Sequence, residues 1–343
     1  MNGQPRVLIL GLKWPPETFL SRLIAGLARR GLDVTVAVNG RPAAHEPAPA
    51  GVKLLALPRR GAPPVERYDV LYFPWNTAAI AHAPLLGRRP AVISCRGSQV
   101  NVAPHNPERA AIREGLATTF AQAAAVHCVS AHIRDEATRY GLDAAKAVVI
   151  RPAVDPDEFR PGDAARPAGP LRVITTGSVI WRKGYEYALL AMRALLDGGV
   201  AAHFDIIGGG PEAQRLLYTL HDLGLQEHVV WHGARPPGDV LRQLQAADVF
   251  LLTSLSEGIS NAVLEGMACG LPVVTTAVGG MAEAVSDGVE GALVPERDPA
   301  STAAALARAE ADRGGQAILV EFEDAAGASR ALGPADGVTP LVV

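Results

Sequence analysis

The sequence predicts an α/β protein with two doubly wound, Rossmann-like domains that face each other across a cleft. Short apolar runs alternate with longer amphipathic segments through most of the 343 residues, a pattern typical of parallel strands covered by helices. The stretch Arg151–Pro170 interrupts this alternation and contains five prolines. We therefore expect a linker there, and we assign residues 1–160 to the first domain and 161–343 to the second.

The first domain is expected to contain seven parallel strands, because seven short runs of its sequence are apolar on both faces. These runs are Val7–Leu10, Val34–Val38, Val52–Leu57, Val70–Phe73, Ala91–Ser94, Val126–Val129 and Val148–Ile150. The segment Phe19–Arg30 has apolar residues at helical spacing and is followed by Gly31, a typical C-terminal cap. Further helices are predicted at Pro107–Ala125 and Ala131–Tyr140.

The second domain repeats the alternation after the linker. Its expected strands are Leu171–Thr175, Phe204–Ile207, Val229–Trp231, Val249–Thr253, Val273–Thr276 and Ala292–Val294. Its expected helices lie near Tyr185–Leu196, Glu212–Leu223, Pro237–Ala246 and Asn261–Ala268. Ligands of such sheets bind at the carboxyl ends of the strands. Beyond about Ala311 the pattern thins, and the long amphipathic helix expected at the end of such a domain is missing.

Composition excludes several classes of function. The net charge is −3, with 32 basic and 35 acidic residues, so no nucleic-acid partner is expected. The cysteines Cys95, Cys128 and Cys269 are widely spaced, which indicates reduced core residues and not a disulfide framework. The nine histidines show no metal-ligand spacing, so neither a metal nor another cofactor is expected.

The chain is expected to be cytoplasmic. Its first apolar run predicts a strand and not a signal peptide, and no apolar stretch reaches the roughly 20 residues of a membrane span. Arginine pairs at Arg29–Arg30, Arg59–Arg60 and Arg88–Arg89 are typical of helix ends and solvated loops. They leave open a peripheral contact with anionic lipid at the inner face of the membrane.

Chemistry-bearing residues concentrate in Ser254–Gly291. A strand ends at Thr253, and a helix is expected to begin near Ser260 and Asn261, which are favourable N-cap residues. The free amides of such a helix start bind phosphate groups. Glu265 lies one turn further on, where its carboxylate would accept hydrogen bonds from sugar or ribose hydroxyls. The alternative is that Glu257 caps this helix and Glu265 is a solvated surface residue.

Three motifs resemble glycosyltransferase family 4. Glu257 and Glu265 are separated by seven residues within SEGISNAVLEGMACGLPVVTT, as in the paired-glutamate motif of that family. TTGSVIWRKGYEYALLAM is similar to its G-x-x-x-x-x-K-G segment, and IIGGGPEAQRL to its glycine-rich turn. The resemblance covers about Leu171–Pro299. The looser match of PPETFLSRLIAGLARRGLDVTV is to members that build exopolysaccharides of the colanic-acid type.

The resemblance implies a GT-B fold and a retaining hexosyltransferase that works in polysaccharide or glycoconjugate biosynthesis without a metal. The second domain would bind a nucleotide-diphosphate sugar, and the first would bind a saccharide, lipid-linked or small-molecule acceptor. Glu257 would face the donor sugar, Glu265 would bind the ribose, and Lys183 would neutralise the diphosphate. The further donor-binding residues would be Gly209, Gly210, Gly258, Ile259, Ser260 and Asn261.

The sequence departs from the family pattern at three places. Ser178 occupies the usual position of an arginine, for which Arg182 is the available substitute. Pro16, Glu17 and Thr18 replace the usual glycine pair in a loop expected to face the acceptor or the diphosphate. Arg96 replaces a histidine that many relatives carry. It would bind an anionic acceptor, bind the donor phosphate, or pair with a carboxylate, and the sequence leaves these open.

Two other functions remain open at this stage. One is a sugar epimerase or phosphorylase with the same two-domain architecture. The other is a catalytically impaired protein that binds sugar nucleotides without turnover, which Ser178 and the atypical tail favour. A dehydrogenase is not indicated, because the glycine-rich Gly208–Ala213 follows the second strand of its domain and not the first.

Overall fold

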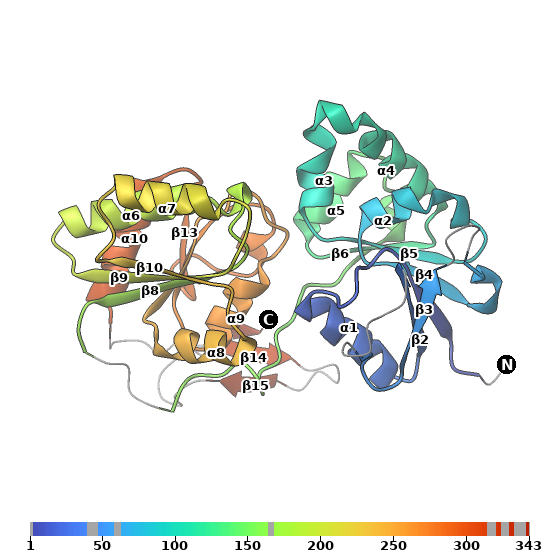
Figure 1. Ribbon diagram of the computed structural model, residues 1–343, viewed down its shortest axis with the longest axis horizontal. Coiled ribbons are helices and arrows are strands. Elements are labelled where there is room, and N and C mark those ends of the chain that lie inside the picture. The colour runs from blue at the N-terminus through green and yellow to red at the C-terminus, as the bar shows by residue number, and fades with distance from the viewer. Residues whose placement is uncertain are drawn as a thin grey trace. The chain divides into compact units, whose positions relative to one another are not determined.

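The computed structural model describes residues 3–39, 47–57, 63–163 and 168–313, together with the backbone of three short strands within residues 320–342. The chain divides into two compact units, Met1–Arg151 and Pro152–Val343. Each unit is built on one large parallel sheet (Figure 1). The α/β class with two Rossmann-like domains is therefore confirmed.

The first unit has a seven-stranded sheet in the order β3-β2-β1-β4-β5-β6-β7. Its strands are β1 (Arg6–Ile9), β2 (Asp33–Asn39), β3 (Val52–Leu57), β4 (Val70–Phe73), β5 (Ala91–Cys95), β6 (Ala125–Cys128) and β7 (Ala147–Val149). Its helices are α1 (Thr18–Arg29), α2 (Asn76–Ala81), α3 (Ser98–Asn101), α4 (Ala110–Gln122) and α5 (Ala131–Thr138).

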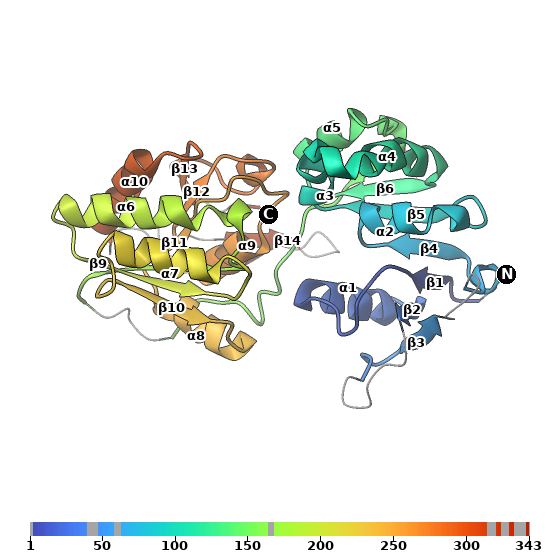
Figure 2. The ribbon, with the colours of Figure 1, turned by 45° about the horizontal axis from the view of Figure 1, so that its top comes forward.

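Both faces of this sheet are covered, which explains why its strands are apolar throughout. Along β1, Leu8 and Leu10 share a core with α2, α4 and α5, whereas Val7 and Ile9 share a core with α1 on the opposite face (Figure 2). Successive side chains of a strand alternate between the two faces, so each face receives every second residue. Gly31, with φ 84°, follows the end of α1 as predicted.

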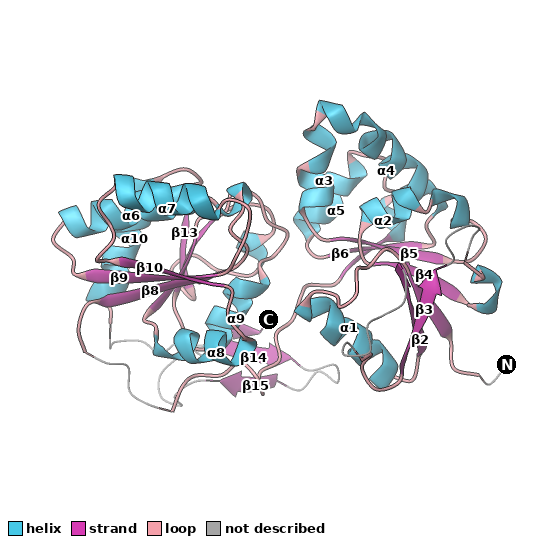
Figure 3. Ribbon diagram, viewed as in Figure 1, coloured by secondary structure: helices cyan, strands magenta, loops and turns pink. Residues whose placement is uncertain are grey.

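The second unit has a six-stranded sheet in the order β10-β9-β8-β11-β12-β13. Its strands are β8 (Leu171–Thr176), β9 (Ala202–Ile207), β10 (Val229–Gly233), β11 (Val249–Leu252), β12 (Val273–Thr276) and β13 (Gly291–Val294). Its helices are α6 (Tyr185–Asp197), α7 (Ala213–Asp222), α8 (Pro237–Ala246), α9 (Asn261–Ala268) and α10 (Pro299–Ala311). Figure 3 shows α6 and α7 on one face of this sheet and α8 and α9 on the other.

The proline-rich stretch begins the second unit. Val154 and Phe159 are buried in the same core as α8 and α9, at 9% and 4% exposure. This packing places the division between the units at Arg151–Pro152, whereas the boundary predicted from the sequence lies after residue 160.

Each sheet has one point where the strand order reverses. It lies between β1 and β4 in the first unit and between β8 and β11 in the second. Loops that leave the carboxyl ends of the two central strands diverge to opposite faces at such a point, and the crevice between them binds ligands. Residues after β8 and β11 are therefore the ones that the fold brings together for a site.

Four features were not predicted from the sequence. The helices α2 and α3 are too short to show a periodic pattern. The helix α10 begins after Asp298, whose carboxylate accepts the Ser301 N–H at 2.9 Å, and this Asp-Pro start could have been recognised. The tail contains the strands β14 (Val320–Glu323), β15 (Ser329–Leu332) and β16 (Leu341–Val342). Apolar and acidic residues alternate along β14, which is the period of a strand.

Two expectations from composition can be compared with the described part of the chain. Cys95, Cys128 and Cys269 are buried and are not in disulfides, as predicted. None of the helices among the described residues combines the length and the apolar character that a membrane span requires.

Candidate active site

An ion pair between Lys183 and Glu257 lies at the strand-order reversal of the second unit. Lys183 ends a short 3₁₀ helix (Trp181–Lys183) after β8, and Glu257 lies in the loop after β11. The Lys183 Nζ donates to Glu257 Oε1 at 2.6 Å, and their side chains are 15% and 11% exposed. The Ser254 hydroxyl donates to the same oxygen at 2.7 Å. The Glu257 carboxylate is thereby fixed, and it does not cap α9, whose N-cap residue is Ser260.

A buried tyrosine, Tyr185, holds the loop after β8 that leads to Lys183. The Tyr185 hydroxyl donates to the Gly177 carbonyl at 3.1 Å. Burial, and secondarily the charge of Glu257, raise the pKa of Tyr185 well above its ordinary value. Tyr185 therefore stays protonated and acts as a hydrogen-bond donor that holds the loop after β8.

The start of α9 presents free backbone donors beside Glu257. Ser260 occupies the N-cap position, but its hydroxyl makes no capping hydrogen bond, contrary to the role expected for this residue type. Its own N–H points to the sulfur of Met281 at 3.4 Å. Within the described residues, the N–H groups of Asn261 and Ala262 have no acceptor. Unsatisfied amides at a helix start, favoured by the helix dipole, are suited to an anion such as phosphate.

Glycines allow the loops of this site to pack backbone against backbone. A Cβ on Gly208 would lie 1.8 Å from the Gly177 carbonyl oxygen, and one on Gly210 would lie 2.2 Å from that of Val179. In the same way, a Cβ on Gly279 would lie 2.0 Å from the carbonyl oxygen of Glu257. The loops after β8, β9, β11 and β12 are thus held together at one edge of the sheet.

The other donor-site candidates lie around this centre. Glu265 is half-buried on α9, and Ser178 is exposed in the loop after β8. The Arg182 carbonyl accepts the Leu255 N–H at 2.7 Å, which ties the loop after β8 to the loop after β11. Gly209 is exposed, and Gly210 has the packing role described above.

The first unit has a separate polar group at the carboxyl ends of β4 and β5. Arg96 donates from Nε to the Pro74 carbonyl at 3.3 Å and from Nη2 to the Tyr72 hydroxyl at 3.1 Å. The loop after β1 leads through Pro16 and Glu17 into α1, which begins at Thr18. Glu17 occupies the N-cap position of α1 but makes no capping hydrogen bond with its side chain.

The two halves of the chain match two profiles of related proteins. Residues 16–158 match the profile described as Glycosyltransferase Family 4, and residues 170–312 match the one described as Glycosyl transferases group 1. The chain belongs to glycosyltransferase family 4. The family resemblance predicted from the sequence motifs is thereby confirmed.

Proteins similar to this chain include ones named for exopolysaccharide biosynthesis. The chain is 37% identical over 175 residues to an Escherichia coli K12 protein named as a colanic acid biosynthesis glycosyltransferase, WcaL, covering 49% of this chain and 43% of WcaL. It is 34% identical over 206 residues to the D-inositol 3-phosphate glycosyltransferase of Acidothermus cellulolyticus, covering 53% and 46% of the two chains. The aligned part thus spans less than half the length of these relatives.

Solved structures share the fold over nearly the whole chain. HepE of Anabaena, solved in complex with UDP-glucose, superimposes with a TM-score of 0.74 at 20% identity and covers 91% of this chain and 92% of its own. Sucrose-phosphate synthase of Thermosynechococcus elongatus gives a TM-score of 0.75 at 21% identity, covering 90% of each chain. The GT-B fold expected for the family is confirmed.

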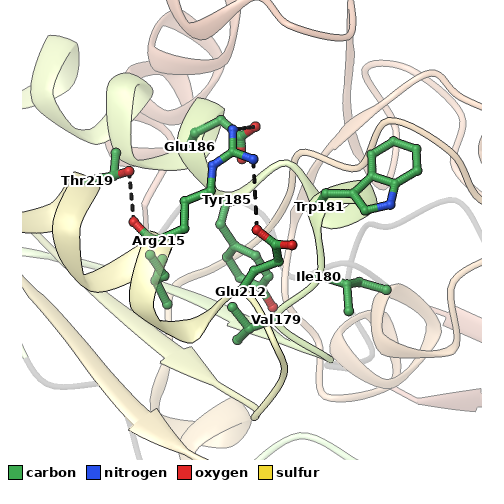
Figure 4. A pocket seen from close by; sticks show the side chains of 9 residues that line it. Val179, Ile180, Trp181, Tyr185, Glu186, Glu212, Arg215 and Thr219 are labelled. Carbon is green, nitrogen blue, oxygen red and sulfur yellow. Dashed lines mark hydrogen bonds and ion pairs between the residues drawn. The ribbon is translucent and has the colours of Figure 1, made fainter.

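Neither of two cavities in the second unit is lined by Lys183 or Glu257. One, of about 20 Å³, lies between the loop after β8 and α7, where Arg215 extends between Glu186 and Glu212 (Figure 4). That volume holds about one water molecule and is too small for a sugar nucleotide. The other, of about 420 Å³, is lined by Asp248, Pro272 and Gly291 at the amino ends of β11, β12 and β13. Ligands of such sheets bind at the opposite ends of the strands.

Motif matching missed the residues that position the site. Ser254 donates to Glu257, and Tyr185 donates to the Gly177 carbonyl in the loop after β8. Each is a common residue type whose partner is set only by the fold. Within the described ranges, no group of three or more His, Cys, Asp or Glu side chains is placed to hold a metal ion.

Proposed function

We propose that this chain transfers a hexosyl group from a nucleotide-diphosphate sugar to an acceptor hydroxyl with retention of configuration. The observation that carries the proposal is the fixed Lys183–Glu257 pair beside the free amides of Asn261 and Ala262. A cation and two N–H donors at one sheet edge suit a diphosphate, whose negative charge grows as the sugar leaves. The UDP-glucose complex of HepE, a protein with this fold, supports the same class of donor.

Each residue has a role in this mechanism. Lys183 and the start of α9 would stabilise the departing diphosphate, which removes the need for a metal ion. Glu257, held by Ser254 and Lys183, would face the sugar, and Glu265 would accept hydrogen bonds from the ribose. The acceptor hydroxyl would attack the sugar on the same face from which the diphosphate departs, and the leaving phosphate would take the proton of that hydroxyl. The names of WcaL and of the amylovoran protein AmsK support a role in polysaccharide biosynthesis, and for such a role we propose a saccharide or lipid-linked acceptor.

Thermal unfolding with nucleotides tests the donor site. We would add UDP, GDP, ADP and TDP in turn, each with and without magnesium. A ligand at 100 times its Kd stabilises the folded state by about 2.7 kcal/mol. One nucleotide should stabilise the protein without magnesium, and Lys183→Met should abolish most of the shift.

The control variant is Lys146→Met in the first unit, where the ammonium donates to the Ala121 carbonyl at 2.7 Å. Its nucleotide shift should equal that of the wild type. Release of nucleoside diphosphate from the stabilising donor would then establish turnover. Binding without release across a panel of acceptors would contradict catalysis, and no shift with any nucleotide would contradict the donor site.

A further inference from the structure

Arg96 is held in one orientation by three neutral groups of the first unit. Its Nε donates to the Pro74 carbonyl, and its Nη2 donates to the Tyr72 hydroxyl. Its guanidinium carbon lies 5.1 Å from the centre of the Phe19 ring, which itself meets Trp75 edge to face at 5.9 Å. A cation over an aromatic face is stabilised by the ring quadrupole. The guanidinium is therefore pre-oriented at the carboxyl edge of the sheet.

A chain of hydrogen bonds runs from Tyr72 to the end of the sheet. Tyr72 and Ser94 are joined at 2.9 Å, Ser94 and His127 Nδ1 at 2.8 Å, and His127 Nε2 and the Ile150 carbonyl at 2.9 Å. These residues lie on the adjacent strands β4, β5 and β6. Tyr72 and Ser94 are buried, so the end of this hydrogen-bond chain next to Arg96 is shielded from solvent, whereas Ile150 at its other end is exposed.

The proton directions along these hydrogen bonds follow from the carbonyl at their far end and from the burial of His127. The Ile150 carbonyl can only accept, so His127 Nε2 carries a proton. Burial lowers the pKa of His127, so the ring is neutral and its Nδ1 accepts from Ser94. Ser94 then accepts the Tyr72 proton, and Tyr72 turns an oxygen lone pair toward Arg96. The chain therefore fixes Arg96 with an acceptor that carries no charge.

Among the residues that the structure describes, the positive charge of Arg96 has no acidic partner. Arg96 offers five N–H donors, of which two are used by Pro74 and Tyr72. No carboxylate of a described residue forms an ion pair with it. Arg313 shows the contrast, since that half-buried guanidinium pairs with both Asp248 and Glu310. The sequence left open that Arg96 pairs with a carboxylate of the protein. The described residues show no such pair.

We propose that Arg96 is the centre of an oxyanion-binding site that holds a phosphate or carboxylate group of the acceptor. A guanidinium with free N–H groups matches the geometry of these anions. The donor diphosphate has its own partners in the second unit, namely Lys183 and the start of α9. This inference rests on the proposed transfer reaction, because it names the class of acceptor. Tyr72, Ser94 and His127 are positioning residues that act through Arg96.

The test observes Arg96 itself in the whole protein. The Nε–H signals of arginine are recorded by NMR on protein labelled with ¹⁵N-arginine, and Arg96 is assigned by its loss in Arg96→Gln. Inorganic phosphate and acetate are titrated at constant ionic strength set with chloride. The same titration is repeated after saturation with the nucleotide that stabilises the protein. Arg113, which is exposed and donates to the Pro104 carbonyl, is the reference in the same spectrum.

We expect phosphate to shift the Arg96 signal saturably, at concentrations at least about tenfold lower than those that affect Arg113. The shift should persist with nucleotide bound. Tyr72→Phe should weaken phosphate binding at Arg96 about fivefold, which is the loss of one hydrogen bond, whereas Arg113→Gln should leave it unchanged.

Two outcomes would overturn the proposal. If neither phosphate nor acetate shifts Arg96 more readily than Arg113, there is no oxyanion site. If the nucleotide itself shifts Arg96 and then abolishes its response to phosphate, the anion is the donor diphosphate and not the acceptor. Failure of the proposed transfer reaction would look different from both outcomes. It would appear as missing nucleotide binding or missing turnover, whereas the Arg96 signal in the phosphate titration is measured independently of either.

Discussion

Lys183 and Glu257 are 74 residues apart in the sequence, yet their side chains meet at 2.6 Å across the strand-order reversal of the second sheet. The parallel topology explains this contact, because β8 and β11 are neighbours and their loops leave the sheet at the same edge. Ser254 donates to the same carboxylate oxygen, so the pair is part of a three-residue network. Such networks are rigid, and the loss of one member leaves the others unsatisfied.

Replacing Lys183 should therefore affect both stability and turnover. In Lys183→Met, the mostly buried carboxylate of Glu257 keeps Ser254 but loses its cation, and we expect the free energy of unfolding to fall by about 1–3 kcal/mol. Turnover should fall about 10²–10³-fold, because one stabilising group is removed from the leaving diphosphate. Urea unfolding and initial rates at saturating donor measure the two effects.

Arg193→Ala is the matched control for losing an ion pair. Arg193 pairs with Asp197 one turn along α6 at 2.6 Å, but the side chains are 34% and 64% exposed, far more than those of Lys183 and Glu257. Exposed pairs of this kind contribute about 0.3–0.5 kcal/mol. Equal losses in stability and rate for Arg193→Ala and Lys183→Met would show that the Lys183–Glu257 pair has no special role.

Two neighbouring glycines should respond differently to alanine. Gly209 and Gly210 both have ordinary φ angles, so the space around the added Cβ decides the outcome. The new Cβ in Gly210→Ala would lie 2.2 Å from the Val179 carbonyl oxygen, whereas in Gly209→Ala the nearest atom is the Ala234 Cβ at 3.8 Å. Gly210→Ala should cost about 1–3 kcal/mol by overpacking, and Gly209→Ala should stay within about 0.5 kcal/mol of the wild type.

Thermal and urea unfolding of both glycine variants measure this difference. Because Gly210 holds the loop after β9 against the loop after β8, its variant should also bind the donor nucleotide more weakly. A stable Gly210→Ala with unchanged nucleotide affinity would mean that the two loops separate without cost.

Two serines at helix starts give a second matched pair. The Ser130 hydroxyl, fully buried, accepts the Ile133 N–H at 3.1 Å and caps α5. Ser260 has the same position at α9 without such a bond. Ser130→Ala should lower the free energy of unfolding by about 1 kcal/mol, and Ser260→Ala should lower it less. Urea unfolding without nucleotide measures both, and a larger loss for Ser260→Ala would contradict the observed capping.

Much of this architecture follows from local properties of the chain. Strands such as Val70–Phe73 and Val273–Thr276 are apolar on both faces and are bounded by turn residues, so the sequence predicts them with the observed bounds. The helix Asn261–Ala268 was likewise predicted with its observed ends. Short helices such as Ser98–Asn101 carry no such periodicity, because one turn is too short to repeat a pattern.

Only the site residues that lie in a recognised sequence motif were predicted. Lys183 and Glu257 were identified by their resemblance to the family, and the fold then placed them in contact. Tyr72, Ser94 and His127 occur singly inside apolar strands, where each has the composition of an ordinary strand residue. Their connection depends on which strands are neighbours and on the register between them, and neither is encoded within a single segment.

His127 should make the stability of the protein depend on pH. Its pKa is lowered in the folded state, first by burial and then by the nearby charge of Arg96, while the hydrogen bond to the Ile150 carbonyl opposes the shift. In the unfolded chain a histidine has a pKa of about 6.5. Between that value and the lower folded pKa the unfolded state binds the proton and the folded state does not. The stabilisation is therefore fully present above about pH 6.5 and is lost as the pH falls below it.

Urea unfolding at pH 7.5 and 5.5 measures this loss by comparison with His127→Gln. The glutamine amide can accept from Ser94 and donate to Ile150 without titrating, so the variant should lose less stability between the two pH values than the wild type. Asp69, whose pKa is lowered to about 2 beside Arg6, titrates below this window and does not interfere. His221→Gln, at an exposed position of α7, is the control for removing a histidine. If the wild type and His127→Gln lose equal stability, His127 does not titrate as a buried neutral ring, and the assigned proton directions between Tyr72, Ser94 and His127 Nδ1 would be wrong.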